Sequence, residues 1–324
     1  MRCGSAVFGF VAVCALVVCS GDARDQTKRR SSISSPRFMM RGRRYKVTPT
    51  HFQPVVIQIT NDQFCGGTML DGKHILTAAH CFFHHATICT RMFNTTRWRQ
   101  AVFDKKKMAI YAQGTCIGCT ERGYTQARLL AGRVEEIAVP KRYVRSRCHR
   151  SDIAVVRLRE NILPDVNVRI PFDEDKLPDN KTPLEVSGFG FDPDHPSTKA
   201  RYLNKIEVTL TTCPTKQVKE VMCIAEKESD ACQGDSGSGL VEHLKTGGIV
   251  VHGVVSSGRT LIHSSNVQKR AGVQVNRTFK GGYFTSSANY ARFICKATHE
   301  EAKLVGGKRC AEISEDRRGM PLVF

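Results

Sequence analysis

Short apolar segments separated by polar turns recur along most of this chain of 324 residues. The first, residues 54–59, is rich in valine and isoleucine, and these β-branched side chains favour strands. A hairpin is predicted over residues 68–76, where Asp71-Gly72 separates two short apolar runs, because both positions of such a turn favour positive φ. This hairpin would lead directly to His80.

The middle of the chain and its second half continue the strand pattern. Residues 153–158 predict a buried strand with Asp152 at its head. Residues 159–183 are rich in proline, aspartate and asparagine, so they predict a linker between two halves. Residues 240–255 hold two apolar runs separated by Thr-Gly-Gly, and this pattern again favours a hairpin.

A helical pattern replaces the strand pattern near the C-terminus. Ser287 is expected to cap this helix, and Gly306-Gly307 to end it. Four apolar residues recur at i, i+3, i+4 and i+7, and they are Tyr290, Phe293, Ile294 and Ala297. The tail at residues 306–324 follows, and the sequence assigns it no role.

The N-terminal residues differ from the rest in composition. Residues 7–19 carry no charge but are too few to span a bilayer, so residues 1–23 are predicted to be a secretory signal peptide. Residues 24–44 are polar and basic, and we expect a propeptide or disordered arm. We expect no membrane span elsewhere, and therefore a secreted, extracellular protein. Three sequons, which mark candidate glycosylation sites, begin at Asn94, Asn180 and Asn276.

The chain contains 14 cysteines, a number that fits an oxidising compartment. Removal of the signal peptide takes three of them, so eleven remain, and the odd count leaves a free thiol or an intermolecular bridge open. Cys116-Ile117-Gly118-Cys119 could suggest a redox motif or half a zinc site. No second cysteine pair at metal spacing accompanies it, so structural disulfides are favoured, and we expect neither a metal nor a cofactor.

The formal charge is +19, and the basic residues form clusters. These clusters are Lys28–Arg30, Arg41–Lys46, Lys105–Lys107 and Lys141–Arg150. Such clusters attract glycosaminoglycans, other polyanions or acidic surfaces, although a basic surface can also serve solubility alone. The cluster before Asp152 could favour acidic substrate residues, anchor a polyanion or be a solvated loop. We do not expect nucleic acid as a partner, because a secreted chain rarely meets it.

Candidate chemistry is concentrated in the stretch from Cys232 to Gly239. Ser236 is flanked there by glycines, which allow a tight turn and a close approach of a substrate carbonyl. The amides of Gly234 and Ser236 could then point at one oxyanion. A serine hydroxyl needs a base, and the base needs an orienting group; His80 and Asp152 are the candidates.

Three blocks around these residues resemble the chymotrypsin/trypsin-like serine peptidases, in that family's order of His, Asp and Ser. The blocks are Leu76–Cys81, Ser151–Val156 and Cys232–Gly239. The resemblance covers about residues 54–295 and implies an all-β fold of two six-stranded antiparallel barrels, with the catalytic cleft between them and a C-terminal helix. The peptidase domain would span residues 45–305, with barrels at about 45–165 and 180–290.

The resemblance also implies roles for single residues. Ser236 would attack the peptide carbonyl, His80 would act as base and then acid, and Asp152 would hold the imidazole. Asp230 would lie at the base of the primary specificity pocket and bind Arg or Lys. The pocket walls would be formed by Ser256, Gly258 and Gly272.

The activation sequence and the cysteine pattern match those of the family only in part. In the family a new amino terminus pairs with the residue that corresponds to Asp235, but the usual Ile-Val-Gly-Gly start is absent here. The resemblance pairs Cys65 with Cys81 and Cys213 with Cys223. It leaves open the pairing of seven cysteines, namely Cys89, Cys116, Cys119, Cys148, Cys232, Cys295 and Cys310.

The sequence therefore predicts a secreted serine endopeptidase, made as a zymogen, that cleaves proteins or peptides after Arg or Lys. Protein inhibitors are further candidate partners. The alternative is a catalytically silent homologue that acts as a polyanion- or protein-binding module. The absent activation sequence and the altered cysteines favour this alternative, whereas the complete set of His80, Asp152 and Ser236 argues against it.

Overall fold

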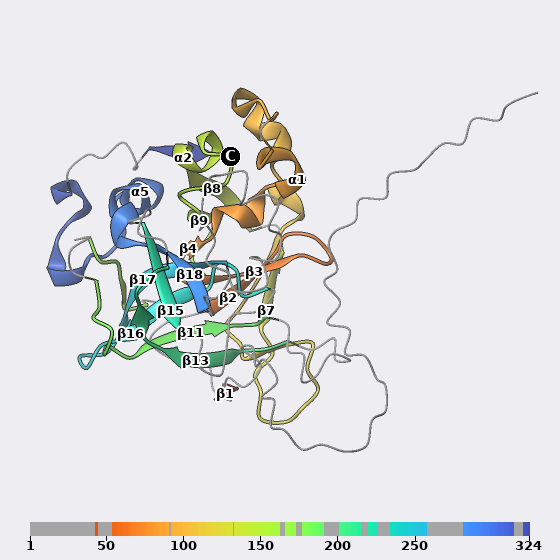
Figure 1. Cartoon of the computed structure of the whole chain (residues 1–324). Coiled ribbons are helices and arrows are strands. Elements are labelled where there is room, and N and C mark those ends of the chain that lie inside the picture. The colour runs from red at the N-terminus through yellow and green to blue at the C-terminus, as the bar shows by residue number, and fades with distance from the viewer. Residues whose placement is uncertain are drawn as a thin grey trace, which may run out of the picture. The chain divides into compact units, whose positions relative to one another are not determined.

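The structure is a computed structural model, and most of the barrel residues are described in it (Figure 1). The described residues are 43–44, 54–90, 92–131, 133–162, 166–172, 177–190, 201–214, 220–225, 234–257, 281–313 and 320–324. The predicted signal peptide and most of the basic arm lie outside them. So do several predicted site residues, namely Asp230, Cys232, Gly258 and Gly272.

The first sheet contains eight strands in the order β19-β8-β9-β4-β3-β2-β5-β7, and neighbouring strands are antiparallel. The strands are β2 (Pro54–Gln58), β3 (Phe64–Met69), β4 (His74–Thr77), β5 (Ala109–Ala112), β7 (Arg128–Ala131), β8 (Val134–Pro140), β9 (Ala154–Leu158) and β19 (Pro321–Val323).

The second sheet contains nine strands, with eight in the order β1-β13-β11-β16-β17-β18-β15-β14 and β10 paired in parallel with β17. They are β1 (Arg43–Arg44), β10 (Val168–Arg169), β11 (Leu184–Gly188), β13 (Asn204–Val208), β14 (Leu210–Thr211), β15 (Val221–Ala225), β16 (Gly239–His243), β17 (Ile249–Ser257) and β18 (Gly281–Ser286). A small third sheet pairs β6 (Cys116–Ile117) with β12 (Arg201–Tyr202).

Both large sheets curl into half-barrels, so the predicted all-β fold of two barrels is confirmed. Each sheet has more than the six expected strands, because short strands such as β1, β14 and β19 extend its edges. The described helices are short: η2 (Ala79–Phe82), α1 (His85–Ile88), η3 (Thr95–Ala101), η4 (Lys105–Lys107), α2 (Lys141–Arg145), η5 (Ala288–Tyr290), α5 (Ala291–Ala297), η6 (Val305–Gly307) and η7 (Cys310–Glu312).

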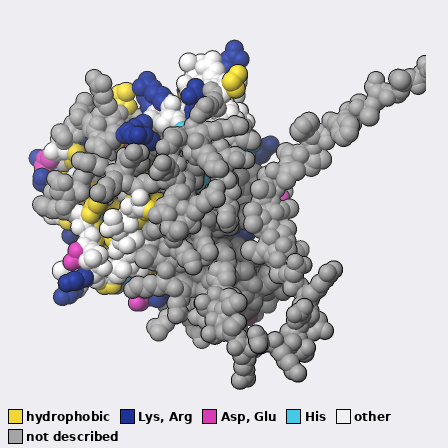
Figure 2. Space-filling view, viewed as in Figure 1, with side chains coloured by type: hydrophobic (Ala, Val, Ile, Leu, Met, Phe, Trp, Pro, Cys, Tyr) yellow, Lys and Arg dark blue, Asp and Glu magenta, His cyan; other side chains and the backbone are white. Residues whose placement is uncertain are grey.

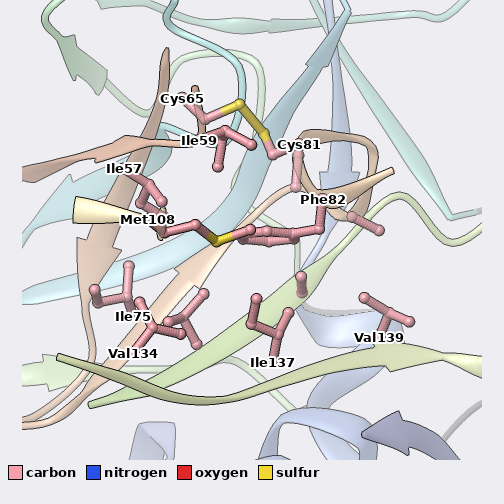
Figure 3. Packing of buried hydrophobic residues seen from close by; sticks show 14 of the residues in the cluster. Ile57, Ile59, Cys65, Ile75, Cys81, Phe82, Met108, Val134, Ile137 and Val139 are labelled. Carbon is pink, nitrogen blue, oxygen red and sulfur yellow. A yellow bond between two sulfur atoms is a disulfide. The ribbon is translucent and has the colours of Figure 1, made fainter. Parts of the chain in front are cut away.

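The interior of the first half is a cluster of aliphatic and aromatic side chains. Figure 3 shows Ile57 of β2, Ile75 of β4, Phe82 of η2 and Ile137 of β8 gathered around Met108. All five are at most 1% exposed. Burial of a side chain of this size contributes about 1.5–3 kcal/mol relative to exposure, so this cluster holds the strands that precede His80.

Strand β2 is apolar at successive positions because its two faces meet different cores. Val55 and Ile57 point into the first cluster, whereas Val56 packs with Phe189 and Leu203 of the second half. Side chains alternate between the faces of a strand, so a strand buried on both faces loses the polar alternation. This explains the continuous apolar run at residues 54–59 in the sequence.

The helix α5 covers the opposite face of the strands that carry the candidate site. Tyr290, Phe293 and Ile294 belong to the same buried cluster as Leu76 of β4 and Val155 of β9. The predicted apolar stripe is thus confirmed, and it packs on the face that points away from the interior of the first half. This packing fixes the end of β4, which His80 follows, and the start of β9, which Asp152 precedes.

Two predicted boundaries of this helix are wrong. The helix ends at Ala297 and not at Gly306-Gly307, which lie in the separate turn η6. Ser287 stands at the cap position of η5, but its hydroxyl donates to the carbonyl of Val251. The Ser287 hydroxyl, which was expected to cap the helix, therefore forms a tertiary hydrogen bond to β17 instead.

The segment after the helix belongs to the fold. Cys295 and Cys310 form a disulfide that closes a loop over residues 296–309. Further on, β19 pairs with β8 in antiparallel register, with Leu322 opposite Val139. In the part of the chain that the structure describes, no helix is long and apolar enough to cross a membrane.

Candidate active site

Neighbouring strand ends bring His80 and Asp152 together. Strand β4 ends at Thr77, three residues before His80, and strand β9 begins at Ala154, two residues after Asp152. Thr77 and Ala154 are directly paired across the antiparallel ladder. The hairpin predicted before His80 is confirmed by the pairing of β3 with β4, and the Asp71 carboxylate holds its turn by accepting from the amide of His74 at 2.8 Å.

The turn η2 that carries His80 is also held covalently. Cys81 is joined by a disulfide to Cys65 of β3, the pair that the resemblance implies (Figure 3). In the chain-entropy model, a disulfide that closes a loop of about 15 residues stabilises the fold by about 3 kcal/mol. The bridge therefore limits how far His80 can move from the sheet.

Asp152 contacts His80 at two points. Oδ2 of Asp152 lies 2.8 Å from Nδ1 of His80, and Oδ1 accepts a hydrogen bond of 2.8 Å from the His80 backbone amide. Nδ1 must carry a proton to donate to the carboxylate, so the neutral imidazole presents a basic Nε2 on its other side. The arrangement fixes both the tautomer and the ring orientation of His80.

A third donor reaches the same carboxylate from the second half. The hydroxyl of Ser256, near the end of β17, donates a hydrogen bond of 2.6 Å to Oδ2 of Asp152. The sequence assigned Ser256 only to a pocket wall. Its contact with Asp152 was missed, because nothing in the pattern of residues 249–257 indicates which carboxylate a hydroxyl will meet.

The electrostatics of the pair follow from burial and mutual charge. Burial lowers the pKa of His80, but the negative charge of Asp152 and the hydrogen bond to it outweigh burial and raise this pKa above its ordinary value. Burial raises the pKa of Asp152, but the charge of His80 and the bonds from His80 and Ser256 lower it below its ordinary value. Asp152 is therefore ionised at neutral pH and stabilises an imidazolium.

Ser236 lies on a tight turn that packs against the first half. Its carbonyl accepts a hydrogen bond of 2.7 Å from the amide of Gly66, and the amide of Gly237 donates to Val255 at 2.8 Å. Gly237 has φ of 87°, and a Cβ there would lie 2.1 Å from Oγ1 of Thr77. Both the positive φ and the close contact require glycine at this position.

The candidate nucleophile Ser236 and the candidate base His80 lie near each other without a hydrogen bond between their side chains. The carbonyl of Ser236 lies 4.0 Å from Sγ of Cys81, the residue that follows His80. Within the described residues, no hydrogen bond joins the Ser236 hydroxyl to His80. Catalytic hydrogen bonds are often long without substrate, so this separation is compatible with proton transfer.

The two candidate oxyanion amides have no partner among the described residues. Neither the amide of Gly234 nor that of Ser236 donates to a described group. Gly234 has φ of 99°, a conformation that glycine adopts without strain. Because backbone N–H groups are strong donors, these two amides are candidates for binding an anionic oxygen.

Asp235, between these two amides, points inward and is fully buried. Its Oδ1 accepts a hydrogen bond of 2.8 Å from the amide of Gly190. A Cβ at Gly188 or Gly190 would lie 2.2 Å from a carboxylate oxygen of Asp235, so glycine at both positions makes room for the carboxylate.

A largely buried chain of polar side chains begins at Ser151, the residue before Asp152. The hydroxyl of Tyr290 lies 2.7 Å from Oγ of Ser151 and also contacts Oε2 of Glu220. Because a phenol has one proton and a carboxylate only accepts, Tyr290 donates to Glu220 and accepts from Ser151. Arg142 completes the chain with a bond of 3.4 Å to Glu220. This set of hydrogen bonds could not be predicted from the sequence, because Arg142, Glu220 and Tyr290 are far apart in it.

A second histidine stands beside the first. The ring of His85 on α1 meets that of His80 edge to face, with centroids 5.6 Å apart. Nothing in the sequence around His74 or His85 singles either residue out. His74 is in fact fully buried, with Nδ1 2.7 Å from Oδ2 of Asp71.

The described residues contain three groups with metal-ligating atoms close together. Two of them include the disulfides Cys65–Cys81 and Cys295–Cys310, whose sulfurs offer no thiolate. In the third, Nδ1 of His74 donates to Asp71 and lies 3.8 Å from Glu301. That hydrogen bond accounts for the cluster without an ion.

Five disulfides join ten cysteines among the described residues. Beside Cys65–Cys81, the structure pairs Cys213 with Cys223, as the resemblance implies. The other three, which the sequence left open, are Cys89–Cys148, Cys116–Cys119 and Cys295–Cys310. The Cys89–Cys148 bridge ties the C-terminal end of α1, the helix that begins at His85, to the basic loop before Asp152.

Comparison with known families and proteins agrees with this geometry. Residues 42–278 match the model of the family described as Trypsin. The chain is 27% identical to Transmembrane protease serine 11C of Mus musculus over 237 residues, which are 68% of this chain and 47% of that protein. It is 24% identical to Trypsin theta of Drosophila melanogaster over 213 residues, which cover 62% and 71% of the two chains.

A third similar protein is Venom serine protease of Polistes dominula, with 23% identity over 274 residues that cover 80% of this chain and 88% of that one. The match to the mouse protein spans only about half of that protein's length.

Proposed function

Because the chain belongs to the trypsin family of serine peptidases, we propose that it is a serine endopeptidase with His80, Asp152 and Ser236 as its catalytic residues. The observation that carries the proposal is the Asp152 carboxylate, which receives both His80 and Ser256 at hydrogen-bond distance. An ionised, buried carboxylate behind an imidazole is what a serine nucleophile needs from its base.

The proposed reaction proceeds in two stages. Nε2 of His80 takes the hydroxyl proton of Ser236 as Oγ attacks the peptide carbonyl, and the imidazolium returns this proton to the leaving amine. The acyl group then remains on Ser236. Water attacks the ester with His80 again as base, which releases the acid and restores the serine. The amides of Gly234 and Ser236 bind the oxyanion in both stages.

Cleavage after Arg or Lys is proposed from the resemblance alone. Asp230 would supply the charge at the base of the specificity pocket, with Ser256, Gly258 and Gly272 along its walls. Asp230, Gly258 and Gly272 lie outside the described residues. The proposal therefore rests on the string Asp230–Asp235 in the sequence, and substrate panels must test it.

Secretion as a processed zymogen is proposed as well. The predicted signal peptide and the five disulfides support an oxidising compartment. Asn94, the first residue of a sequon, is exposed at the start of η3, so a glycan could be attached there. Protein inhibitors that occupy a substrate cleft are a corresponding class of partner.

The test is labelling of the purified protein, before and after limited trypsin treatment, with a phosphonate probe for active-site serines. We expect labelling of Ser236 that is lost in Ser236→Ala and in His80→Ala. Reporter peptides with Arg, Lys or Phe before the cut then test the pocket, with Asp230→Ser expected to reduce cleavage after Arg. Absence of labelling in every processed form would favour the silent homologue.

A second candidate function is polyanion binding, and a hollow beside the C-terminal segment favours it. A cavity of about 560 Å³ is lined by Arg169, Lys303, Lys308, Arg309 and one acid, Glu300. Figure 2 also shows lysine and arginine side chains gathered in several places on the described surface. Arg309 is already paired with Glu312 at 2.7 Å, and a bound anion would offset the charge of the remaining cations.

Heparin is a suitable probe for this basic hollow. We expect a Kd that rises with salt, and a weaker salt dependence when Arg169, Lys303 and Lys308 are replaced together by Gln. The matched control replaces Lys105, Lys106 and Lys107 of η4. If the control loses as much affinity as the hollow variant, binding is a property of the general charge. If neither the parent nor the variants bind heparin at physiological salt, polyanion binding is excluded.

A further inference from the structure

The buried carboxylate of Asp235 stands between the two amides that would bind the oxyanion. It has no exposed surface, and an ionised carboxylate is stable in such a place only when donors and positive charge face it. The amide of Gly190 is one donor, at 2.8 Å. The position of Asp235 in turn fixes the peptide groups on both of its sides.

The peptide group between Phe189 and Gly190 links Asp235 to a cation. Its N–H donates to Oδ1 of Asp235, and its carbonyl oxygen accepts a hydrogen bond of 3.2 Å from Nη1 of Arg201. The two charged side chains thus hold opposite ends of one peptide dipole. A guanidinium on the carbonyl polarises the peptide and strengthens the N–H as a donor to the carboxylate.

Arg201 is itself held in place by the fold. Its guanidinium lies 4.4 Å from the ring centroid of Phe64, on the strand β3 that also carries Gly66. Its backbone belongs to β12, where Arg201 is paired with Ile117 of β6. Burial lowers the pKa of Arg201, while the negative charge of Asp235 raises it, so the two charges interact.

We propose that Arg201 is a positioning residue for the oxyanion-binding turn. Through the Phe189–Gly190 peptide it stabilises the ionised, inward-pointing state of Asp235, and this state keeps the amides of Gly234 and Ser236 in place. The inference rests on the proposed peptidase function. Asp235 can have further partners, because the proposal concerns only the contribution that Arg201 makes to its position.

This role predicts an effect on the rate of the chemical step and little effect on substrate binding. A displaced oxyanion amide is felt mainly when negative charge develops on the substrate oxygen, so kcat should change more than KM. Loss of the cation also removes part of the stabilisation of the ionised, inward-pointing Asp235 carboxylate. Protonated Asp235 is held less firmly in its inward-pointing position. As the pH is lowered, the variant should therefore lose activity at a higher pH than the wild type.

The experiment compares the processed full chain with Arg201→Gln and Arg201→Lys. We expect Arg201→Gln to lower kcat about 10- to 100-fold with KM changed less than about threefold, as for partial loss of an oxyanion donor. Arg201→Lys keeps the charge but not the planar fork, so its kcat should lie between the two. The acid limb of the pH–kcat profile should move upward in the order wild type, Lys, Gln.

The matched control is Arg99→Gln. Arg99 also lies over an aromatic ring, at 4.8 Å from the centroid of Trp98, but it has no described contact with Asp235. It should leave kcat and the pH profile unchanged. If Arg201→Gln does not fold, Arg201→Lys carries the test, and its wild-type kcat together with an unmoved acid limb would overturn the proposal.

The outcomes separate the two proposals. An inactive and unlabelled wild type refutes the peptidase function itself. An active wild type whose Arg201→Gln variant keeps the same kcat and acid limb refutes the positioning role of Arg201 alone.

Discussion

Ser256 and Asp152 come from different halves of the molecule, yet the Ser256 hydroxyl donates a hydrogen bond of 2.6 Å to the same carboxylate oxygen that faces His80. Strand β17 of the second sheet thus helps to set the charge and direction of a carboxylate at the edge of the first. The candidate base is therefore controlled by both halves together.

Removal of this donor should change both rate and pH dependence. In Ser256→Ala the Asp152 carboxylate loses one hydrogen bond, so its pKa rises and it holds an imidazolium more strongly. The pKa of His80 then rises further, and the acid limb of kcat/KM moves to higher pH by a few tenths of a unit. A lost bond of about 0.5–1.5 kcal/mol corresponds to roughly a 2- to 10-fold lower rate. Ser257→Ala, next to it on β17, is the control and should leave the limb in place.

The opposite shift is expected for Asp152→Asn. The charge of Asp152 raises the pKa of His80 against the effect of burial, so without this charge burial prevails and the pKa falls below the ordinary value near 6.5. The acid limb of kcat/KM should therefore move to lower pH, while the maximal rate falls by about four orders of magnitude through loss of the correct tautomer. An acid limb that stays in place in this variant would show that another group controls it.

The chain of polar side chains that begins at Ser151 should contribute to stability. Tyr290→Phe removes the donor to Glu220 and leaves a buried carboxylate with Arg142 as its remaining described side-chain partner, so the free energy of unfolding should fall by about 1–3 kcal/mol in a urea titration. Tyr143→Phe is the matched control, because Tyr143 is equally buried but its hydroxyl has no described partner. The control should be neutral or stabilising. Equal losses of unfolding free energy in both variants would mean that the loss comes from any buried tyrosine hydroxyl and not from the hydrogen bond to Glu220.

The disulfide of the C-terminal segment offers a separate test. In the double variant Cys295→Ser, Cys310→Ser a loop with a sequence separation of 15 is opened. We expect the free energy of unfolding to fall by about 3 kcal/mol. Labelling of Ser236 should persist at low temperature, because the bridge does not contact the candidate site. Affinity for heparin should decrease, since Cys310 also lines the basic hollow.

The buried hydroxyl of Ser238, two residues after Ser236, is expected to lower the stability of the fold. Its Oγ is buried without a hydrogen-bond partner among the described residues, and it lies so close to Gly66 that a Cβ there would be 2.1 Å away. Ser238→Ala should raise the free energy of unfolding by about 1 kcal/mol. Thr77→Val should lower it by a similar amount, because the Thr77 hydroxyl donates to the carbonyl of Gly66 at 2.7 Å. Thermal unfolding of both variants would reveal the opposite signs.

Local patterns in the sequence predicted the strands and the pair of residues that flank the site. The Asp71-Gly72 turn, the strand after Asp152 and the apolar stripe of α5 depend on nearby residues, and the structure confirms all three. His80 and Asp152 could be singled out because the motif blocks around them resemble those of a known family.

Contacts between distant segments could not be predicted in this way. Ser256 meets Asp152 only after the two sheets have curled and packed, whereas Arg201 meets the carbonyl of Phe189 once the neighbouring strands β11 and β13 have paired. Ser287 likewise does not form the predicted cap, because its hydroxyl donates to the carbonyl of Val251 on the neighbouring strand. Periodicity describes the faces of an element, whereas partners across the core depend on tertiary packing.

The pairing of β19 with β8 has a consequence for how the protein is made. A ribosome releases β8 long before β19, so the edge of the first sheet stays unpaired while the whole second half is synthesised. An open edge is a template for wrong pairing, and contacts this distant in sequence form slowly. The nascent first half should therefore need protection by a chaperone until residues 321–323 have been synthesised and can pair with β8.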